Sequence, residues 1–246
     1  MRRALMTMGT EAASDPSTQG TGMVEEPGQD FLRLLSWVSP AFPTGGFAYS
    51  HALEWAVEAG DIIALDSLVD WMSALLAHGS LRADMIFIRH AWQAGEDIRK
   101  LEEIAAYAGA CASSRERYEE TVYQGEAFLK AASVWDDSLA QKRSTTVRWP
   151  LPVAQGAVFR RGGAQERQAV LAGGHMAVAA LVSAAVRLVP LGQTDGLRAQ
   201  VKLETVILDA LKQTEQCGLD DVGTACFRSD LAAMHHETQE TRLFRT

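Results

Sequence analysis

Apolar residues recur at helical spacing along almost the whole chain, and the two-residue alternation of half-buried strands is nearly absent. Between Leu65 and Leu76 they fall at 65, 68, 69, 72, 75 and 76, which forms one continuous stripe on a helix. A second stripe follows Ser80, which we expect to be the N-cap of its helix. A third runs from 101 to 112 and predicts a core position for Cys111.

Further helices are predicted over about 114–135 and 166–188, from Thr194 to about Gln213, and from about Asp230 onward. Thr194 and Ser229 are the expected N-caps of the last two. The sequence therefore predicts a single all-α domain over 30–246, a bundle of about eight to eleven helices. Residues 1–29 are rich in Gly, Ser, Thr, Pro and Gln, and we expect them to form a disordered N-terminal tail.

Composition narrows the possible functions. The net charge of −8 argues against a nucleic-acid surface. The three cysteines do not pair at useful spacing, which favours a reducing, cytoplasmic location. The segment 169–186 lacks charged residues and is almost long enough to span a bilayer. Because it is mostly alanine with glycine and serine, we interpret it as a helix buried in the bundle and predict no transmembrane segment.

No stretch of the sequence supplies a phosphate-binding loop, a nucleophile elbow or a zinc-protease helix, and catalysis is not predicted. We predict no bound cofactor or resident metal. Neighbouring residues on a helix point about 100° apart, so His235 and His236 do not easily chelate one ion, and we interpret them as a solvated helix surface. The alternative is a helical nickel carrier that uses His235, His236 and Glu237.

The first distinctive segment, Ser39–Glu54, reads SPAFPTGGFAYSHALE. Its prolines and glycines predict a rigid turn before a helix, with Phe47 and Tyr49 placed beside the helix start. These aromatic residues either form a contact surface or fold inward against the helix end. Glu54 lies one helical turn before Glu58, and we expect both carboxylates to face solvent.

The second segment, Val186–Gly196, reads VRLVPLGQTDG. Arg187 suits the negative end of a helix, whereas Gln193 and Asp195 stand at the positive start of the next one. A helix–turn–helix corner explains each of these residues by architecture alone. No ligand needs to be assumed.

The third segment, Asp230–Arg245, has a short apolar stripe of Leu231 and Met234 and ends in Arg242–Arg245, RLFR. An ending in which Leu-Phe is flanked by arginines is either a frayed tail or a peptide that docks on a partner.

Together the three segments resemble the UreF family of urease accessory proteins, and the resemblance covers Phe31 to Phe244. It implies an all-α cytoplasmic chaperone with no reaction of its own, acting as a homodimer in nickel insertion. Implied partners are the D- or H-type accessory scaffold, the G-type accessory GTPase and apo-urease, with 229–246 as the docking segment. Carried over by position, the partner-binding residues are Phe47, Tyr49, Glu54, Arg187, Gln193, Asp195, Arg242, Leu243 and Phe244.

Overall fold

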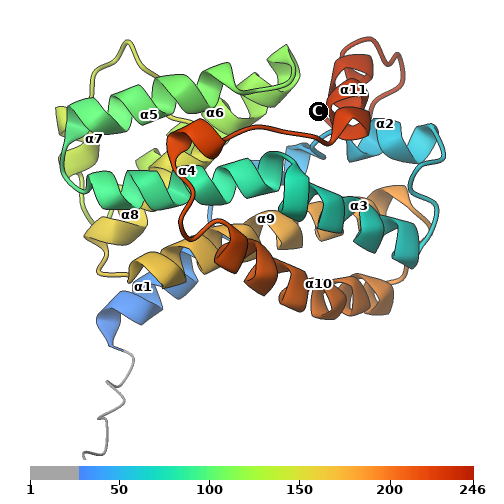
Figure 1. The fold of residues 1–246 in the computed structure, drawn as a ribbon, viewed down its shortest axis with the longest axis horizontal. Coiled ribbons are helices and arrows are strands. Elements are labelled where there is room, and N and C mark those ends of the chain that lie inside the picture. Colours follow the sequence, from blue (N-terminus) through green and yellow to red (C-terminus); the bar gives the residue numbers. More distant parts are fainter. Residues whose placement is uncertain (1–27) are drawn as a thin grey trace, which may run out of the picture.

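The computed structural model describes residues 28–246, and this part of the chain contains helices and no strands, so the all-α prediction is confirmed (Figure 1). The expected tail lies largely outside the described residues, and the first helix begins at Gln29. The α-helices are α1 Gln29–Val38, α2 Leu53–Glu58, α3 Leu65–His78, α4 Ser80–Ala94, α5 Ile98–Ala110, α6 Arg115–Ala132, α7 Ser138–Lys142, α8 Leu151–Arg161, α9 Glu166–Leu188, α10 Gln193–Gln213 and α11 Phe227–His236.

Helices α4, α8 and α9 form the centre of the bundle. In Figure 1, α4 and α9 cross the middle of the molecule, α5 to α7 cover one side, and α10 covers the other. Glycines permit the closest approaches: a Cβ on Gly156 of α8 would lie 2.3 Å from the Ile88 carbonyl oxygen of α4. One hydrophobic cluster joins these helices, and a small satellite cluster forms where α11 packs on α2.

Helix α9 is the small-residue helix that the sequence predicts within the bundle. It is the single described helix that is long and apolar enough to cross a membrane. Half of its most apolar stretch is buried inside the protein, and α9 packs against α4, α8 and α10. Its composition is accounted for by helix–helix packing at close range.

Three predicted N-caps are wrong. Ser80 is the first residue of α4, and its hydroxyl lies 2.7 Å from His51 Nε2 instead of capping the helix. The first turn of α10 already closes at the Gly192 carbonyl and that of α11 at the Cys226 carbonyl, so Thr194 and Ser229 lie inside their helices. The core position predicted for Cys111 is also wrong: α5 ends at Ala110, and Cys111 follows its last turn in an exposed position.

Candidate partner-binding site

The loop between α1 and α2 is shaped by glycine and by backbone strain. Gly45 has φ of 73°, in the left-handed region, and is followed by a 3-10 turn at Gly46–Ala48. His51 and Ala52 also have positive φ values of 57° and 63°, which is costly for residues with a side chain. Such strain persists only where surrounding contacts enforce it. Here they come from Ser80 of α4, whose hydroxyl contacts the His51 ring, and from the end of the chain.

Residues 237–246, which we call the terminal strap, leave α11 and return across this loop. The Arg245 amide donates to the Ala48 carbonyl at 2.9 Å, and the Ser50 amide donates to the Thr246 carbonyl at 3.0 Å. The Phe244 side chain is buried in the main core cluster. The strap is therefore folded onto the domain, and the frayed-tail alternative is wrong in this structure.

Glu54 holds the strap through its carboxylate. Oε1 accepts the Leu243 amide at 2.6 Å and Oε2 accepts the Phe244 amide at 2.9 Å. Glu54 is only 8% exposed, so the expectation of a solvent-facing carboxylate is wrong. The negative charge of the Glu54 carboxylate is satisfied by donors more than 180 residues away in the sequence. The local Glu54–Glu58 spacing does not reveal these donors.

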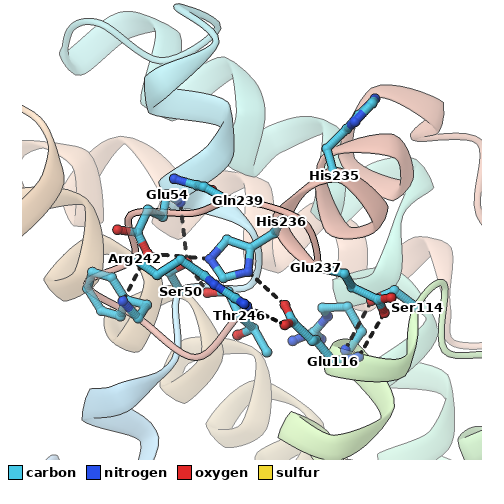
Figure 2. A network of polar contacts seen from close by, with 12 residues as sticks. Ser50, Glu54, Ser114, Glu116, His235, His236, Glu237, Gln239, Arg242 and Thr246 are labelled. Carbon is cyan, nitrogen blue, oxygen red and sulfur yellow. Dashed lines mark hydrogen bonds and ion pairs between the residues drawn. The ribbon is translucent and has the colours of Figure 1, made fainter.

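His236 joins Glu54 to Glu116 of α6, and Figure 2 shows its ring between the two carboxylates. The distances are 3.4 Å from Nε2 to Glu54 Oε2 and 2.7 Å from Nδ1 to Glu116 Oε2. Arg242 of the strap donates to Glu116 Oε1 at 2.6 Å. His236 is fully buried, so the predicted solvated surface is wrong for this histidine. The network connects α2, α6, α11 and the strap.

Arg187, near the end of α9, lies between two aromatic rings. Its guanidinium carbon is 3.8 Å from the Phe47 ring centre and 4.4 Å from that of Phe244. Nη1 donates to the Phe47 carbonyl at 2.9 Å. Partial burial lowers the pKa of Arg187 from its ordinary value. The corner at the end of α9 therefore fastens the first loop to the strap, beyond its role in chain reversal.

Replacing Arg187 with lysine should weaken this fastening, because lysine keeps the charge but loses the flat stacking surface. We expect a loss of about 1–2 kcal/mol in local stability. Amide hydrogen exchange at Leu243 and Phe244 would show it as faster exchange. Arg198→Lys, at an exposed pair with Asp195, is the matched control and should leave both amides unchanged. Equal exchange in the Arg187 variant would contradict the fastening role.

The outer surface around the strap is apolar. Phe47 is 73% exposed and Leu243 69%, so the alternative in which Phe47 folds inward is wrong. On α11 the residues Phe227, Leu231 and Met234 face outward, whereas alanines and His236 form the buried face. The predicted Leu231–Met234 stripe thus lies on the opposite side from the core. Large apolar side chains are thus exposed on the loop, on the strap and on α11.

The structure brings six of the nine residues carried over from the resemblance to one place; they are Phe47, Glu54, Arg187, Arg242, Leu243 and Phe244. Tyr49 is in the same loop but buried. Gln193 and Asp195 stand apart: within residues 28–246 no hydrogen bond joins either of them to the strap or the loop, and Asp195 pairs with Arg198 at 2.9 Å. Sequence reasoning did not identify Glu116 and did not place His236 in this network, because their partners are remote in sequence.

The residues of the alternative nickel site do not converge. His235 stacks on Trp55 with ring centres 4.9 Å apart, and in Figure 2 it points away from His236. Glu237 accepts the Arg115 amide at 2.8 Å. Within residues 28–246, no group of three or more His, Cys, Asp or Glu side chains is placed to hold a metal ion. The geometry gives the carrier alternative no support.

Comparison with known proteins yields one consistent family. The family model described as UreF matches residues 63–204. A urease accessory protein UreF from Bradyrhizobium sp. strain BTAi1 is 43% identical over 95% of this chain and 99% of its own length. A protein of the same name from Rhodopseudomonas palustris strain BisB5 is 41% identical over 97% of this chain and 100% of its own length. Another from Agrobacterium fabrum is 44% identical over 87% of this chain and 96% of its own length.

Proposed function

This chain belongs to the UreF family of urease accessory proteins, and we propose that it acts in urease maturation as an adaptor between other accessory proteins. Membership of this accessory family makes it a non-catalytic protein. In the proposed role it binds the D- or H-type scaffold, and the pair recruits the G-type GTPase so that nickel is inserted into apo-urease. Nickel is then the cargo of the assembly, and the site of action is the cytoplasm.

The observation that carries the proposal is the surface formed by the loop, the strap and α11. Phe47 and Leu243 present large apolar side chains to solvent on a backbone that is held by Glu54 and Arg187. Rigid aromatic and arginine groups give much contact area for little entropy loss, which is typical of binding hot spots. We propose that this surface receives the scaffold, with 229–246 as the docking segment.

A second contact surface is proposed on α10. Leu197, Val201 and Leu208 are exposed, and their spacing of four and seven residues places them on one helix face. Gln193 precedes Leu197 by one turn, and Asp195 lies in the same first turn. We assign this face to a second copy of the chain, which would make the adaptor a homodimer.

The scaffold surface is tested with the double variant Phe47→Ala/Leu243→Ala. Phe47→Ala removes one of the two rings that stack on Arg187, so the free energy of unfolding should fall by up to about 1 kcal/mol. Scaffold affinity should fall by more than this accounts for, at least about tenfold. Co-purification with the scaffold followed by titration measures the effect. The control is Val134→Ala; Val134 is 83% exposed and lies just beyond the C-terminal end of α6. Unchanged affinity in the double variant would remove this surface from the proposal.

A further inference from the structure

A cavity of about 500 Å³ lies under the loop that joins α1 to α2. Its other walls come from α4, α6, α8 and α9. The volume is in the range of small-molecule sites, which combine apolar walls with a few polar groups. Phe47 and Arg187 are among its lining residues, and Glu120 of its wall accepts a bond from the strap, but Asp84, Gln124 and Gln155 make no hydrogen bond to the strap. What the cavity holds is therefore a separate question from the adaptor role.

Asp84 of α4 brings an uncompensated carboxyl group to this cavity. It also borders a smaller cavity of about 80 Å³, so it lies in the wall that the two share. Within residues 28–246 its side chain has no hydrogen bond or ion pair. Arg117 is close but pairs with Glu120, which also accepts the Thr246 hydroxyl at 2.5 Å. Burial raises the pKa of Asp84 to about 7; Arg117 opposes the rise and Glu120 adds to it.

The other free polar atoms in the wall include two amide oxygens that accept hydrogen bonds. Gln124 donates its amide to Glu120 at 3.4 Å and Gln155 donates to the Met176 sulfur at 3.0 Å, which leaves both side-chain oxygens without a donor. His51 is engaged with Ser80, and burial lowers its pKa well below the ordinary value, so it stays neutral. Two guanidinium groups, of Arg117 and Arg187, also line the cavity, but they pair with Glu120 and with the Phe47 carbonyl. Within residues 28–246 no side chain of the wall donates a hydrogen bond to Asp84.

Two glycines keep the space beside these oxygens open. A Cβ on Gly46 would lie 3.1 Å from the Gln124 side-chain oxygen, and one on Gly173 would lie 3.3 Å from that of Gln155. Apolar side chains of Met85, Ile88 and Leu181 line the same cavity. A ligand that satisfies this wall has several N–H donors, a positive charge and an aliphatic stem.

We propose that the cavity binds an aliphatic organic cation, whose ammonium or guanidinium group pairs with Asp84 while its stem contacts the apolar wall. Charge-assisted hydrogen bonds to one carboxylate and to neutral amide oxygens suit N–H donors of this kind. A divalent metal ion would need several anionic or imidazole ligands, and the described residues do not gather them here. The cation is either a free small molecule or the side chain of a bound protein.

Titration of the full chain with n-butylguanidinium and n-butylammonium tests the site. We expect saturable binding that Asp84→Asn weakens at least about tenfold, since the amide keeps the shape and loses the charge. Asp209→Asn, at an exposed carboxylate paired with Lys212, is the control and should bind as the native chain does. Neutral 1-pentanol should not distinguish the native chain from Asp84→Asn. Equal affinity of both chains for the cations overturns the proposal, as does the absence of binding to the native chain.

A second measurement needs no variant. The carboxyl carbon resonance of Asp84 in the native chain should shift toward the ionised position as the cation is added near pH 7, and an unmoved resonance overturns the proposal.

A competition experiment distinguishes a free small molecule from the side chain of a bound protein as the source of the cation. A protein side chain would be displaced by n-butylguanidinium, so scaffold or GTPase affinity would fall in its presence and in Asp84→Asn. A free ligand leaves both affinities unchanged.

Discussion

Alanine in place of Gly125 is expected to lower the free energy of unfolding by at least about 3 kcal/mol. Gly125 is in the middle of α6, where helix propensity alone favours alanine by about 1 kcal/mol. Packing decides against it, because the new Cβ would lie 2.0 Å from the Trp149 carbonyl oxygen and 2.8 Å from the Leu151 nitrogen. Both obstacles are backbone atoms, one just before α8 and one in its first residue, so they cannot rotate away as a side chain could.

Denaturant unfolding followed by circular dichroism measures this change. Gly223→Ala is the control, because a Cβ there would meet no atom within 4 Å and its stability should change by less than about 0.5 kcal/mol. A Gly125→Ala chain as stable as the native one would show that α6 and the start of α8 are free to separate. Given a total stability of about 5–15 kcal/mol for a typical domain, the expected loss is large.

Glu54→Ala is expected to release the terminal strap and to cost about 3 kcal/mol or more. The substitution removes the acceptor of two backbone amides and one contact of His236. These groups are buried, and an unsatisfied buried donor loses its solvation without a replacement. Proteolysis at Arg242 and Arg245 should accelerate, and scaffold affinity should fall at least about tenfold if the strap surface is the docking site.

The control for this variant is one turn further along α2. Glu58 is exposed and accepts a single bond from Gln239 at 2.6 Å, so Glu58→Ala should change stability by less than about 1 kcal/mol. If Glu54→Ala and Glu58→Ala lowered the free energy of unfolding by similar amounts, Glu54 would not be the residue that holds the strap. Accelerated proteolysis with unchanged scaffold affinity would separate the strap from partner binding and leave its architectural role intact.

The helices themselves could be predicted from the sequence. Because each helix buries one face, its apolar residues recur at helical spacing. Helix α3 and the small-residue helix α9 appear at the positions that periodicity indicates. Their starting residues were less predictable. Ser80 has the chemistry of an N-cap, but a tertiary partner, His51, takes its hydroxyl. The preference of serine for the N-cap position was thus overridden by a contact between residues 29 positions apart.

The candidate site could be predicted only in part, for a similar reason. Local spacing makes Glu54 a surface charge and His236 a surface histidine, yet both are buried and contact each other. The resemblance to UreF proteins identified the segments that meet, although it carried no information on Glu116, which pairs with both His236 and Arg242. The partner-binding roles of the nine residues stay predictions.

The hydrogen bonds from Leu243 and Phe244 to Glu54 span 189 and 190 residues. A ribosome releases the chain in order, so Glu54 emerges long before the amides that satisfy it have been synthesised. Until the strap has been synthesised, the loop that bears Phe47 lacks the strap contacts that support its strained backbone. The Glu54 carboxylate is still hydrated at that stage. Completion of this corner is therefore a late event in biogenesis, and a truncated or stalled chain would present an unfinished version of it to quality-control proteases.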